Sequence, residues 1–404
     1  MTRTLRAALV VALLSPRPVF ATVLTLDDAL ARARREAPTL LAAGLRTDEA
    51  RGRLAGASVL LRDNPVIEAT GGRRQSDTGA SADIDTSIGQ TFELGGRRGS
   101  RIAGAEAEVR REAASAEDAT RQLLRETAAA FLRALAATER ARVLRTNEEV
   151  TADLLGVAER RLRAGDIADL EVNVARLAAW RARADARAAE AAHGRALGDL
   201  QVLLGMEASE ALEVRGDLRG LRVHRLDDLL VAAADRSDVR ALAAEVEAAE
   251  AEARLGEGYT WPDLGVKLGY ARDQGDNIPF AGVSVALPVF NRGQELRATG
   301  TARARRLRLE LAARRRAIDV EVRSIFAAHQ QLVDGVEALE RHALPLLDDN
   351  DALARRSYEA GELSMREYLL VRRETLGTRL DYVERSLDAA IGAVELEARA
   401  GVLR

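Results

Sequence analysis

Hydrophobic and polar positions follow two different periods along the chain, and each period marks one kind of element. Over residues 84–94 apolar and polar side chains alternate one by one, which is typical of a strand with one apolar and one wet face. Similar short segments occur three more times, and a polar loop joins the members of each pair. The four predicted strands are about 65–72, 84–94, 262–272 and 281–289, with loops at 73–83 and 273–279.

The segments between these hairpins have a helical period. A first helix is expected from near Asp27, with Thr25 as its N-cap, toward Leu61, with its face broken at Pro38. After the first hairpin the helical pattern runs over residues 97–163 without a proline. A continuous helix of this size would be ~100 Å long at ~1.5 Å per residue, which no globular core of a chain this size requires.

The second half repeats this plan. A helix over 226–255 precedes the second hairpin, and a long helix follows Gly293. Apolar residues recur in it every seven positions: Leu311, Ile318, Ile325, Leu332, Leu339, Leu346 and Leu353. Sustained heptads predict supercoiled packing of a coiled coil. Pro345 cannot donate a backbone hydrogen bond, so we expect a kink or a joint there.

Short sequences recur about 196 to 200 residues apart, which indicates an internal duplication. The matched pairs are Leu26–Leu30 with Leu226–Leu230, and Ala164–Ala168 with Ala360–Ser364. Solenoid units are ~20–50 residues long, so this repeat is half a protein rather than a solenoid unit. The sequence therefore predicts two structural repeats, 22–222 and 223–404, related by a pseudo-two-fold.

Residues 1–21 have the pattern of a secretory signal peptide. Arg3 and Arg6 form a positive start, residues 7–14 are apolar, and Val19, Phe20 and Ala21 resemble a cleavage site. A short buried helix is the alternative. If the signal is removed, the mature chain begins at Thr22, and the protein is periplasmic, secreted or placed in an outer membrane.

Composition excludes several classes of protein. The chain has 60 Lys and Arg against 63 Asp and Glu, and this balance argues against a nucleic-acid binder. It has no cysteine, which excludes disulfides, thiolate metal sites and N-terminal lipidation. The four histidines (His193, His224, His329 and His342) lack metal-ligand spacing, and no nucleotide-binding or nucleophile motif occurs. We therefore expect neither an enzyme nor a bound cofactor or metal.

The four strands have the length of tilted transmembrane β-strands, ~9–11 residues. Open edges in hydrocarbon leave backbone groups unpaired, so the sheet must close, and the smallest spanning barrels have ~8 strands. Several copies of the chain must then share one barrel, with eight strands from two copies or twelve from three. The small residues Gly265, Gly269, Ala271, Ser284 and Ala286 fit a lumen. An ordinary soluble hairpin pair that caps a helical bundle is the alternative.

With these features in place, the chain resembles the TolC family of outer-membrane efflux proteins over nearly its whole mature length. The resemblance is carried by the duplicated opening, by the strand-to-helix turns at 90–98 and 286–293, and by the hairpin tips at 161–165 and 358–361. The Phe-Glu-Leu-Gly-Gly-Arg-Arg form at 92–98 looks most like the branch that serves heavy-metal, cobalt-zinc-cadmium type pumps.

The resemblance implies a mainly α fold with a transmembrane β-barrel contribution. Three copies would form a homotrimer with a twelve-stranded barrel in the outer-membrane lipid of a Gram-negative bacterium. The long helices would form an α-helical barrel in the periplasm, which docks onto a periplasmic adaptor protein. That adaptor would link it to an inner-membrane pump of the resistance-nodulation-division type, which supplies the energy for transport. The duct itself would be passive, with heavy-metal cations as its expected cargo.

The same resemblance places adaptor contacts at the two periplasmic hairpin tips: Ala164, Gly165, Asp166, Tyr358, Ala360, Gly361, Glu362 and Ser364. From the residues alone, the tip glycines suit a helix reversal, and tight turns without a partner are the alternative. Ser364 is expected to N-cap the second returning helix, and Asp166 or Asp169 the first. The chain departs from better-known relatives at Leu363, where they have a basic residue, so a closing salt bridge is not expected there.

Glu171 and Glu367 lie six residues after the two tip glycines. The family commonly places acids there that face a constricted lumen, and three copies would form a ring that attracts cations. A solvated helix face is the alternative reading of both residues.

Two other functions stay open. An outer-membrane duct for drugs or for protein secretion is one alternative, because a passive bore carries little cargo chemistry. A soluble periplasmic coiled-coil adaptor is the other alternative, although no lipoyl-like domain is visible in the sequence.

Overall fold

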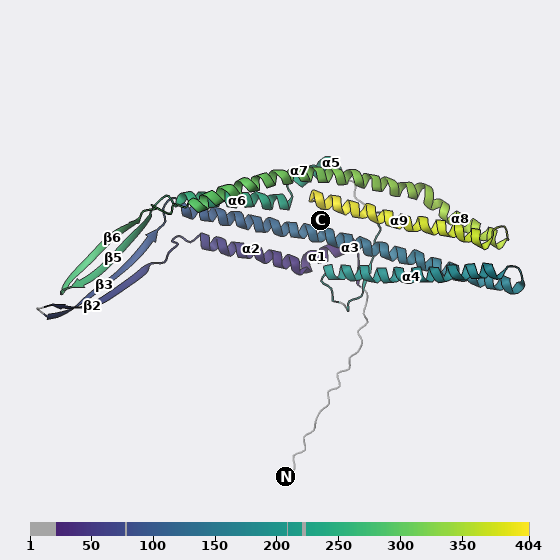
Figure 1. Ribbon diagram of the computed structural model, residues 1–404, viewed down its shortest axis with the longest axis horizontal. Helices are drawn as coiled ribbons and strands as arrows, with labels where there is room; N and C mark the ends of the chain where they lie inside the picture. Colours follow the sequence, from purple (N-terminus) through teal and green to yellow (C-terminus); the bar gives the residue numbers. More distant parts are fainter. Residues whose placement is uncertain (1–21, 77–78, 208, 220–223, 404) are drawn as a thin grey trace, which may run out of the picture. The chain divides into compact units, whose positions relative to one another are not determined.

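The computed structural model describes residues 22–76, 79–207, 209–219 and 224–403. The expected signal peptide, 1–21, lies outside these described residues. Figure 1 shows long helices and one group of strands. The chain divides into two compact units, and each unit collects segments from both halves of the sequence. The first contains residues up to 33, 127–220 and 342–387, and the second contains 34–126, 221–341 and 388–404.

Helices account for most of the described residues. They are α1 (Leu26–Glu36), α2 (Pro38–Ala57), α3 (Arg97–Ala164), α4 (Asp169–Leu203), α5 (Leu226–Ala234), α6 (Ser237–Gly258), α7 (Gln294–Ala338), α8 (Leu344–Glu359) and α9 (Met365–Ala400). The expected long helix is confirmed, since α3 has 68 residues without interruption. No helix in the described part of the chain is both long and apolar enough to cross a membrane.

Local sequence signals set several helix boundaries as expected. Thr25 caps α1, because its hydroxyl accepts a hydrogen bond from the Asp28 N–H while the Asp28 carboxylate accepts one from the Thr25 N–H. Pro38 begins α2 after the break from α1. Pro345 follows a π-helical segment, Leu339–Ala343, which separates α7 from α8 and confirms the expected joint.

The single helix expected over 226–255 is wrong, because two helices, α5 and α6, occupy this stretch. No proline or glycine separates them. Instead Arg236 is buried at the break, where its guanidinium pairs with Asp238 at 2.8 Å and donates to the carbonyl of Arg399 at 2.9 Å. This contact to α9 is tertiary, so the local helical pattern could not reveal it.

The four expected strands are present and form one antiparallel sheet in the second unit. They are β2 (Val66–Ser76), β3 (Gly79–Phe92), β5 (Asp263–Asp273) and β6 (Asp276–Ala286), in the order β2-β3-β5-β6. Ile88 pairs with Leu268, so the hairpins of the two repeats meet through β3 and β5. The sheet leaves β2 and β6 as its two edges among the described residues.

The strands differ from the expected ranges at their turns and ends. The loop expected at 273–279 is only a two-residue turn, where Gln274 and Gly275 both have positive φ angles of 53° and 96°. Such a turn matches the twist of the strands it joins, so pairing continues to its ends. Pro279 therefore lies inside β6, which ends at Ala286 rather than 289, and β3 ends at Phe92 rather than 94.

The two faces of the sheet differ in chemistry. The register places Ile88, Leu268 and their aliphatic neighbours on one exposed face. The five residues expected to line a lumen share the other face with charged side chains. On that face Lys267 pairs with Glu68 at 2.6 Å, and Arg74 bridges Asp83 and Asp273. The sheet therefore has one apolar face and one polar face, as the alternation in the sequence predicts.

Each unit has its own core. In the first unit α3, α4, α8 and α9 share a cluster that includes Leu154, Val172, Tyr358 and Met365. In the second unit Leu229, Ile318, Val322 and Leu396 join α5, α7 and α9. A short parallel pair, β1 (Thr22–Leu24) with β4 (Leu212–Val214), was not expected from the sequence and belongs to the first unit.

Candidate functional site

The two expected tips are built by the same backbone device at both hairpins. At the end of α3 the Gly165 N–H donates to the Leu162 carbonyl and the Asp166 N–H donates to the Arg161 carbonyl, both at 2.9 Å. At the end of α8 Gly361 and Glu362 make the equivalent bonds to Tyr358 and Ser357. The tip glycines have φ angles of 81° and 79°. Each turn is therefore a Schellman motif, which needs a residue that tolerates positive φ.

The returning helices start differently at the two tips. Ser364 precedes α9, and its hydroxyl accepts a hydrogen bond from the Glu367 N–H at 3.3 Å. The Glu367 carboxylate accepts from the Ser364 N–H at 2.9 Å and from its hydroxyl at 2.7 Å. This capping box confirms Ser364 as N-cap. In the first repeat the N-cap is Ala168, which makes no side-chain bond, so the expectation of Asp166 or Asp169 there is wrong.

The two acids expected to act together consequently have different surroundings. Hydrogen bonds from the backbone and side chain of Ser364 lower the pKa of Glu367, because they favour its ionised form. The Glu171 carboxylate has no capping partner, since alanine stands at the position equivalent to Ser364. Among the described residues the Glu171 carboxylate makes no hydrogen bond or ion pair, and its charge helps to raise the pKa of the nearby Tyr358 hydroxyl, whereas the Glu367 carboxylate accepts hydrogen bonds at the start of its own helix.

Most of the tip residues are available on the surface. Six of the eight expected contact residues lie at the turns and are exposed: Ala164, Gly165, Asp166, Ala360, Gly361 and Glu362. Ser364 is also exposed, although its hydroxyl is engaged in the cap. Tyr358 is different, because only 2% of its surface is exposed. Its ring points into the core of the first unit, so a direct adaptor contact by this side chain does not fit the structure.

Tyr358 instead joins the two hairpins. Its ring stacks on that of Tyr368 of α9, with centroids 5.3 Å apart and planes inclined by 15°. The guanidinium of Arg161, from the last turn of α3, lies 5.4 Å from the Tyr358 ring centroid. We call Arg161, Tyr358 and Tyr368 the tip clasp. Both kinds of contact are attractive, the first through ring stacking and the second through the negative face of the ring.

Burial changes the pKa values of the two tyrosine hydroxyls in the clasp. Removal from water raises the pKa of the Tyr358 hydroxyl, and the nearby Arg161 partly opposes this effect. Burial likewise raises the pKa of Tyr368, which is 4% exposed. Both phenols therefore stay neutral through the physiological pH range. Leu363 packs against this cluster.

Sequence reasoning missed the partners of this clasp. Arg161 was part of a tip motif without a role of its own, and Tyr368 was not selected at all. One signal was available, since the chain has only five tyrosines and two of them lie ten residues apart around the second tip. Their pairing across a helix reversal nevertheless depends on the tertiary packing of α8 against α9.

The groups exposed at the tips are suited to contact with another protein. Within the described ranges no group of three or more His, Asp or Glu side chains is arranged to hold a metal ion. The exposed tip residues offer backbone groups and the carboxylates of Asp166 and Glu362 for binding. Such an arrangement can recognise another protein surface.

Comparisons with known proteins agree over most of the chain. The family described as "Outer membrane efflux protein" matches residues 29–206 and 230–402. The cobalt-zinc-cadmium resistance protein CzcC of Cupriavidus metallidurans is 27% identical over 369 residues, which cover 89% of this chain and 86% of CzcC.

Solved structures share the fold. CusC superposes with a TM-score of 0.79 at 17% identity, covering 93% of this chain and 91% of its own. The CmeC outer membrane channel of Campylobacter jejuni gives 0.78 at 14% identity, with 93% and 85% covered. The predicted combination of long helices with four strands per chain is therefore confirmed.

Proposed function

Because the chain belongs to the outer membrane efflux protein family, we propose that it is the outer-membrane duct of a tripartite efflux system. The family consists of efflux channels of Gram-negative outer membranes, so this protein is an outer-membrane efflux channel and not an enzyme. The finer assignment concerns its partners and its cargo. We propose that it receives cargo from a periplasmic adaptor and an inner-membrane pump of the resistance-nodulation-division type.

The pair of equivalent glycine turns at the two tips is the observation that carries this proposal. Two Schellman turns present exposed backbone and two carboxylates, and one core cluster holds both hairpins together. A rigid pair of turns is suited to docking, because little conformational entropy is lost when a preorganised surface binds. We therefore assign adaptor contact to Ala164, Gly165, Asp166, Ala360, Gly361, Glu362 and the backbone of Ser364.

We propose heavy-metal cations as the cargo. The likeness to CzcC, a cobalt-zinc-cadmium resistance protein, over 89% of this chain supports this choice. Passive conduction agrees with it, because a conduit that bound its metal tightly would be blocked by it. Ducts for drugs or for protein secretion remain the alternatives, and the growth test described below separates them.

The assembly we propose is a homotrimer. The sheet has four strands with two open edges, and three copies would supply twelve strands for a closed barrel in the outer-membrane lipid. The long helices would then lie in the periplasm. We further propose that residues 1–21 are the export signal, that 22–222 and 223–404 are structural repeats, and that the chain, which lacks cysteine, is not lipidated.

We assign the lumen-facing acid role to Glu171 before Glu367. In a trimer three copies of each would form a ring, and a ring of free carboxylates raises the local concentration of cations. The Glu171 carboxylate makes no hydrogen bond or ion pair among the described residues, although its charge helps to raise the pKa of the Tyr358 hydroxyl, whereas the Glu367 carboxylate accepts hydrogen bonds from Ser364 at the start of α9. Glu171→Gln should therefore reduce cation selectivity in single-channel recordings more than Glu367→Gln does.

Growth of a deletion strain tests the proposal. Loss of the gene should lower tolerance to cobalt, zinc and cadmium salts, and the wild-type gene should restore it. The charge reversals Asp166→Arg and Glu362→Arg should fail to restore tolerance, although the protein still reaches the outer membrane. The matched control is Glu106→Arg, an exposed acid of α3 far along the chain from the tips.

Three outcomes would contradict the proposal in different ways. Unchanged metal tolerance with increased sensitivity to drugs would reject the cargo. Full activity of both tip reversals would reject the tips as the docking surface. Recovery of the protein in the soluble periplasm, without trimers in outer membranes, would reject the duct itself.

A further inference from the structure

A cavity lies in the first unit where α3, α9 and the segment after β4 come together. Its volume is about 470 Å³, within the range of ~300–1,000 Å³ that is usual for sites of small molecules. All of its lining residues belong to the first unit. The apolar part of the lining comes from Leu135, Val143, Leu218, Leu344 and Val383. A surface of this kind can hold the apolar body of a small organic molecule.

Three guanidinium groups line the same cavity. Arg142 belongs to α3, Arg219 to the segment after β4, and Arg379 to α9. Among the described residues the lining has two carboxylates against them, those of Glu139 and Asp217. Guanidinium groups bind carboxylate, sulfonate and phosphate oxygens through paired, charge-assisted hydrogen bonds. The charged part of the lining is therefore suited to an anion.

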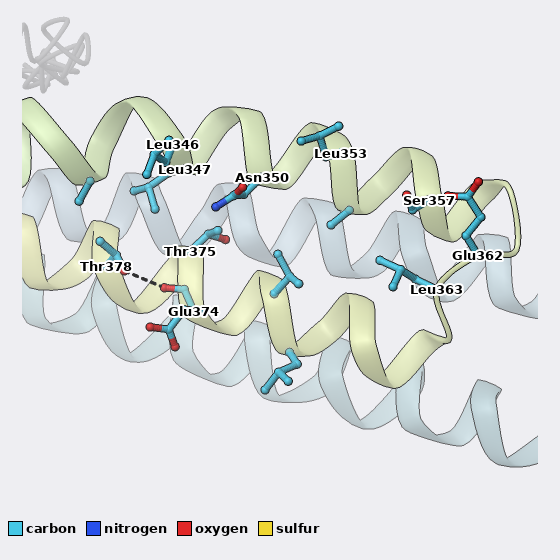
Figure 2. Close-up of a pocket in the computed structure, with 14 residues that line it drawn as sticks. Leu346, Leu347, Asn350, Leu353, Ser357, Glu362, Leu363, Glu374, Thr375 and Thr378 are labelled. Carbon is cyan, nitrogen blue, oxygen red and sulfur yellow. Dashed lines mark hydrogen bonds between the residues drawn. The ribbon is translucent and has the colours of Figure 1, made fainter.

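Figure 2 shows a different pocket of this unit, the groove between α8 and α9 beside the second tip. Its charged lining residues are Glu362 and Glu374, and its lining contains no arginine or lysine. The two linings divide at the end of the π-helical segment, because Ala343 lines the groove and Leu344 lines the cavity. An anion should therefore prefer the cavity, and the groove serves as an internal control.

Two of the three arginines have only local partners. Arg142 pairs at 2.7 Å with Glu139, three residues earlier, and Arg219 pairs at 2.9 Å with Asp217, two residues earlier. Their side chains are 70% and 61% exposed, and exposed ion pairs of this kind contribute little to stability. A ligand anion can therefore replace these carboxylates. Arg379 is less exposed and is held in place by two carboxylates of α8.

The buried side of the cavity has a polar atom without a partner. Ser386 of α9 lines the cavity and is 3% exposed, and its hydroxyl makes no hydrogen bond with any described residue. Buried polar atoms are nearly always hydrogen-bonded, so such a hydroxyl requires an explanation. A polar atom of a bound ligand would supply the hydrogen bond. This observation is independent of the charges at the entrance.

We propose that this cavity binds a small organic anion. Its carboxylate, sulfonate or phosphate group would pair with Arg142 and Arg219, its apolar body would lie against the leucine and valine side chains, and a polar atom would bond to Ser386. The bound anion would connect α3, α9 and the segment after β4, and a ligand that binds only the folded state stabilises it. Guanidinium groups repel metal cations, so this site is distinct from the handling of the proposed cargo.

Photoaffinity labelling with 4-benzoylbenzoate tests the proposal, because this compound joins a carboxylate to an apolar, photoreactive body. The full-length protein is irradiated with it in lipid nanodiscs, and mass spectrometry locates the labelled peptides. We expect saturable labelling near Val143 of α3 and Val383 of α9, with competition by excess 2-naphthoate. Benzophenone, the neutral analogue, should label these peptides at least about tenfold less, since it cannot form the charge-assisted bonds.

Substitutions separate recognition from folding. The double variant Arg142→Gln, Arg219→Gln should raise the Kd at least about tenfold, because both charge-assisted partners are lost. Arg145→Gln is the matched control, since Arg145 is 59% exposed on α3, pairs with Glu190 and does not line the cavity. Ser386→Ala should raise the Kd about fivefold and also raise the Tm of the unliganded protein, because it removes a buried hydroxyl without a partner. A purely structural serine would change the Tm alone.

Several results would overturn the inference. Equal labelling by benzophenone, or an unchanged Kd in the double arginine variant, would show that charge does not direct binding. Labelling confined to the groove of Figure 2 would place the site elsewhere. Displacement of the label by a purified adaptor but not by 2-naphthoate would identify a protein as the occupant. None of these results depends on metal tolerance or on the presence of trimers, so the proposed duct is tested separately.

Discussion

The tip clasp gives the sharpest quantitative prediction about this protein. Arg161, Tyr358 and Tyr368 come from three helices, and they join the turn of the first hairpin to that of the second. The perturbations are Tyr358→Leu, Tyr368→Leu and Arg161→Ala, made singly and in pairs. Leucine keeps an apolar side chain in the core while it removes the aromatic ring.

The magnitude follows from the contact geometry. A stacked aromatic pair contributes about 0.5–1.5 kcal/mol beyond the area it buries. A guanidinium over a ring contributes about 0.5–1 kcal/mol when exposed and about 2 when desolvated, and Arg161 is half-buried, so we expect about 1 kcal/mol. Both couplings should appear as interaction terms in double-mutant cycles, because the residues are in direct contact.

Hydrogen exchange of the tip amides measures these terms. Helix ends open locally at a lower free energy than the whole protein, so the exchange rate near both turns reports the stability of the clasp. A coupling of about 1 kcal/mol changes an opening equilibrium roughly fivefold, since about 1.4 kcal/mol is tenfold. Loss of the Tyr358 ring should accelerate exchange at both tips, although the residue belongs to only one hairpin.

Arg163→Ala is the matched control, because Arg163 lies in the same turn as Arg161, is exposed and contacts no ring. It should leave exchange at the second tip unchanged. If the free-energy effects of the single substitutions add to within about 0.3 kcal/mol in both cycles, the three residues do not stabilise one another and the clasp is refuted. Acceleration confined to the second tip would refute its role in joining the hairpins.

Three further predictions concern the turns themselves. Ser364→Ala should destabilise the start of α9 by about 0.5–2 kcal/mol, and Ala168→Ser should stabilise the start of α4 by a similar amount, both measured by local exchange. The pKa of Glu367 lies below its usual value of 4.5, so the stabilisation it provides is present above that pH and is lost as the pH falls further; Ser364→Ala should weaken this acid dependence without abolishing it, because the larger cause, the hydrogen bond from the backbone N–H of residue 364, remains. Gly361→Ala should cost about 1–2 kcal/mol in thermal unfolding, because its φ of 79° is unfavourable for alanine although the space around it is free.

Helices and strands were predictable from the sequence where one hydrophobic periodicity continues over many residues. The 68-residue helix α3 follows from an uninterrupted helical pattern, and β3 follows from alternation over residues 84–94. Strand ends were less predictable, because residues near turns are polar whether or not they pair. The turn at Gln274 and Gly275 is an example, where backbone geometry extends the pairing beyond the apolar alternation.

At the tips, glycine and serine could be assigned and the aromatic residues could not. Gly165, Gly361 and Ser364 act through their own backbone or the next helical turn, so their roles are readable from a few neighbouring letters. Tyr358 looks like a surface residue in such a local window. Its burial depends on Tyr368 and Arg161, which reach it only after α3, α8 and α9 have packed together.

The sequence alone determined the four strands, the long helices and the two glycine turns, because each of these depends on periodicity or on the conformational preference of single residues. Tertiary structure decided how the elements join: the break between α5 and α6 at buried Arg236 and the clasp around Tyr358. These features depend on contacts between segments far apart in the chain. Their free energies depend on which helix surfaces pack together, and a local sequence pattern does not contain that information.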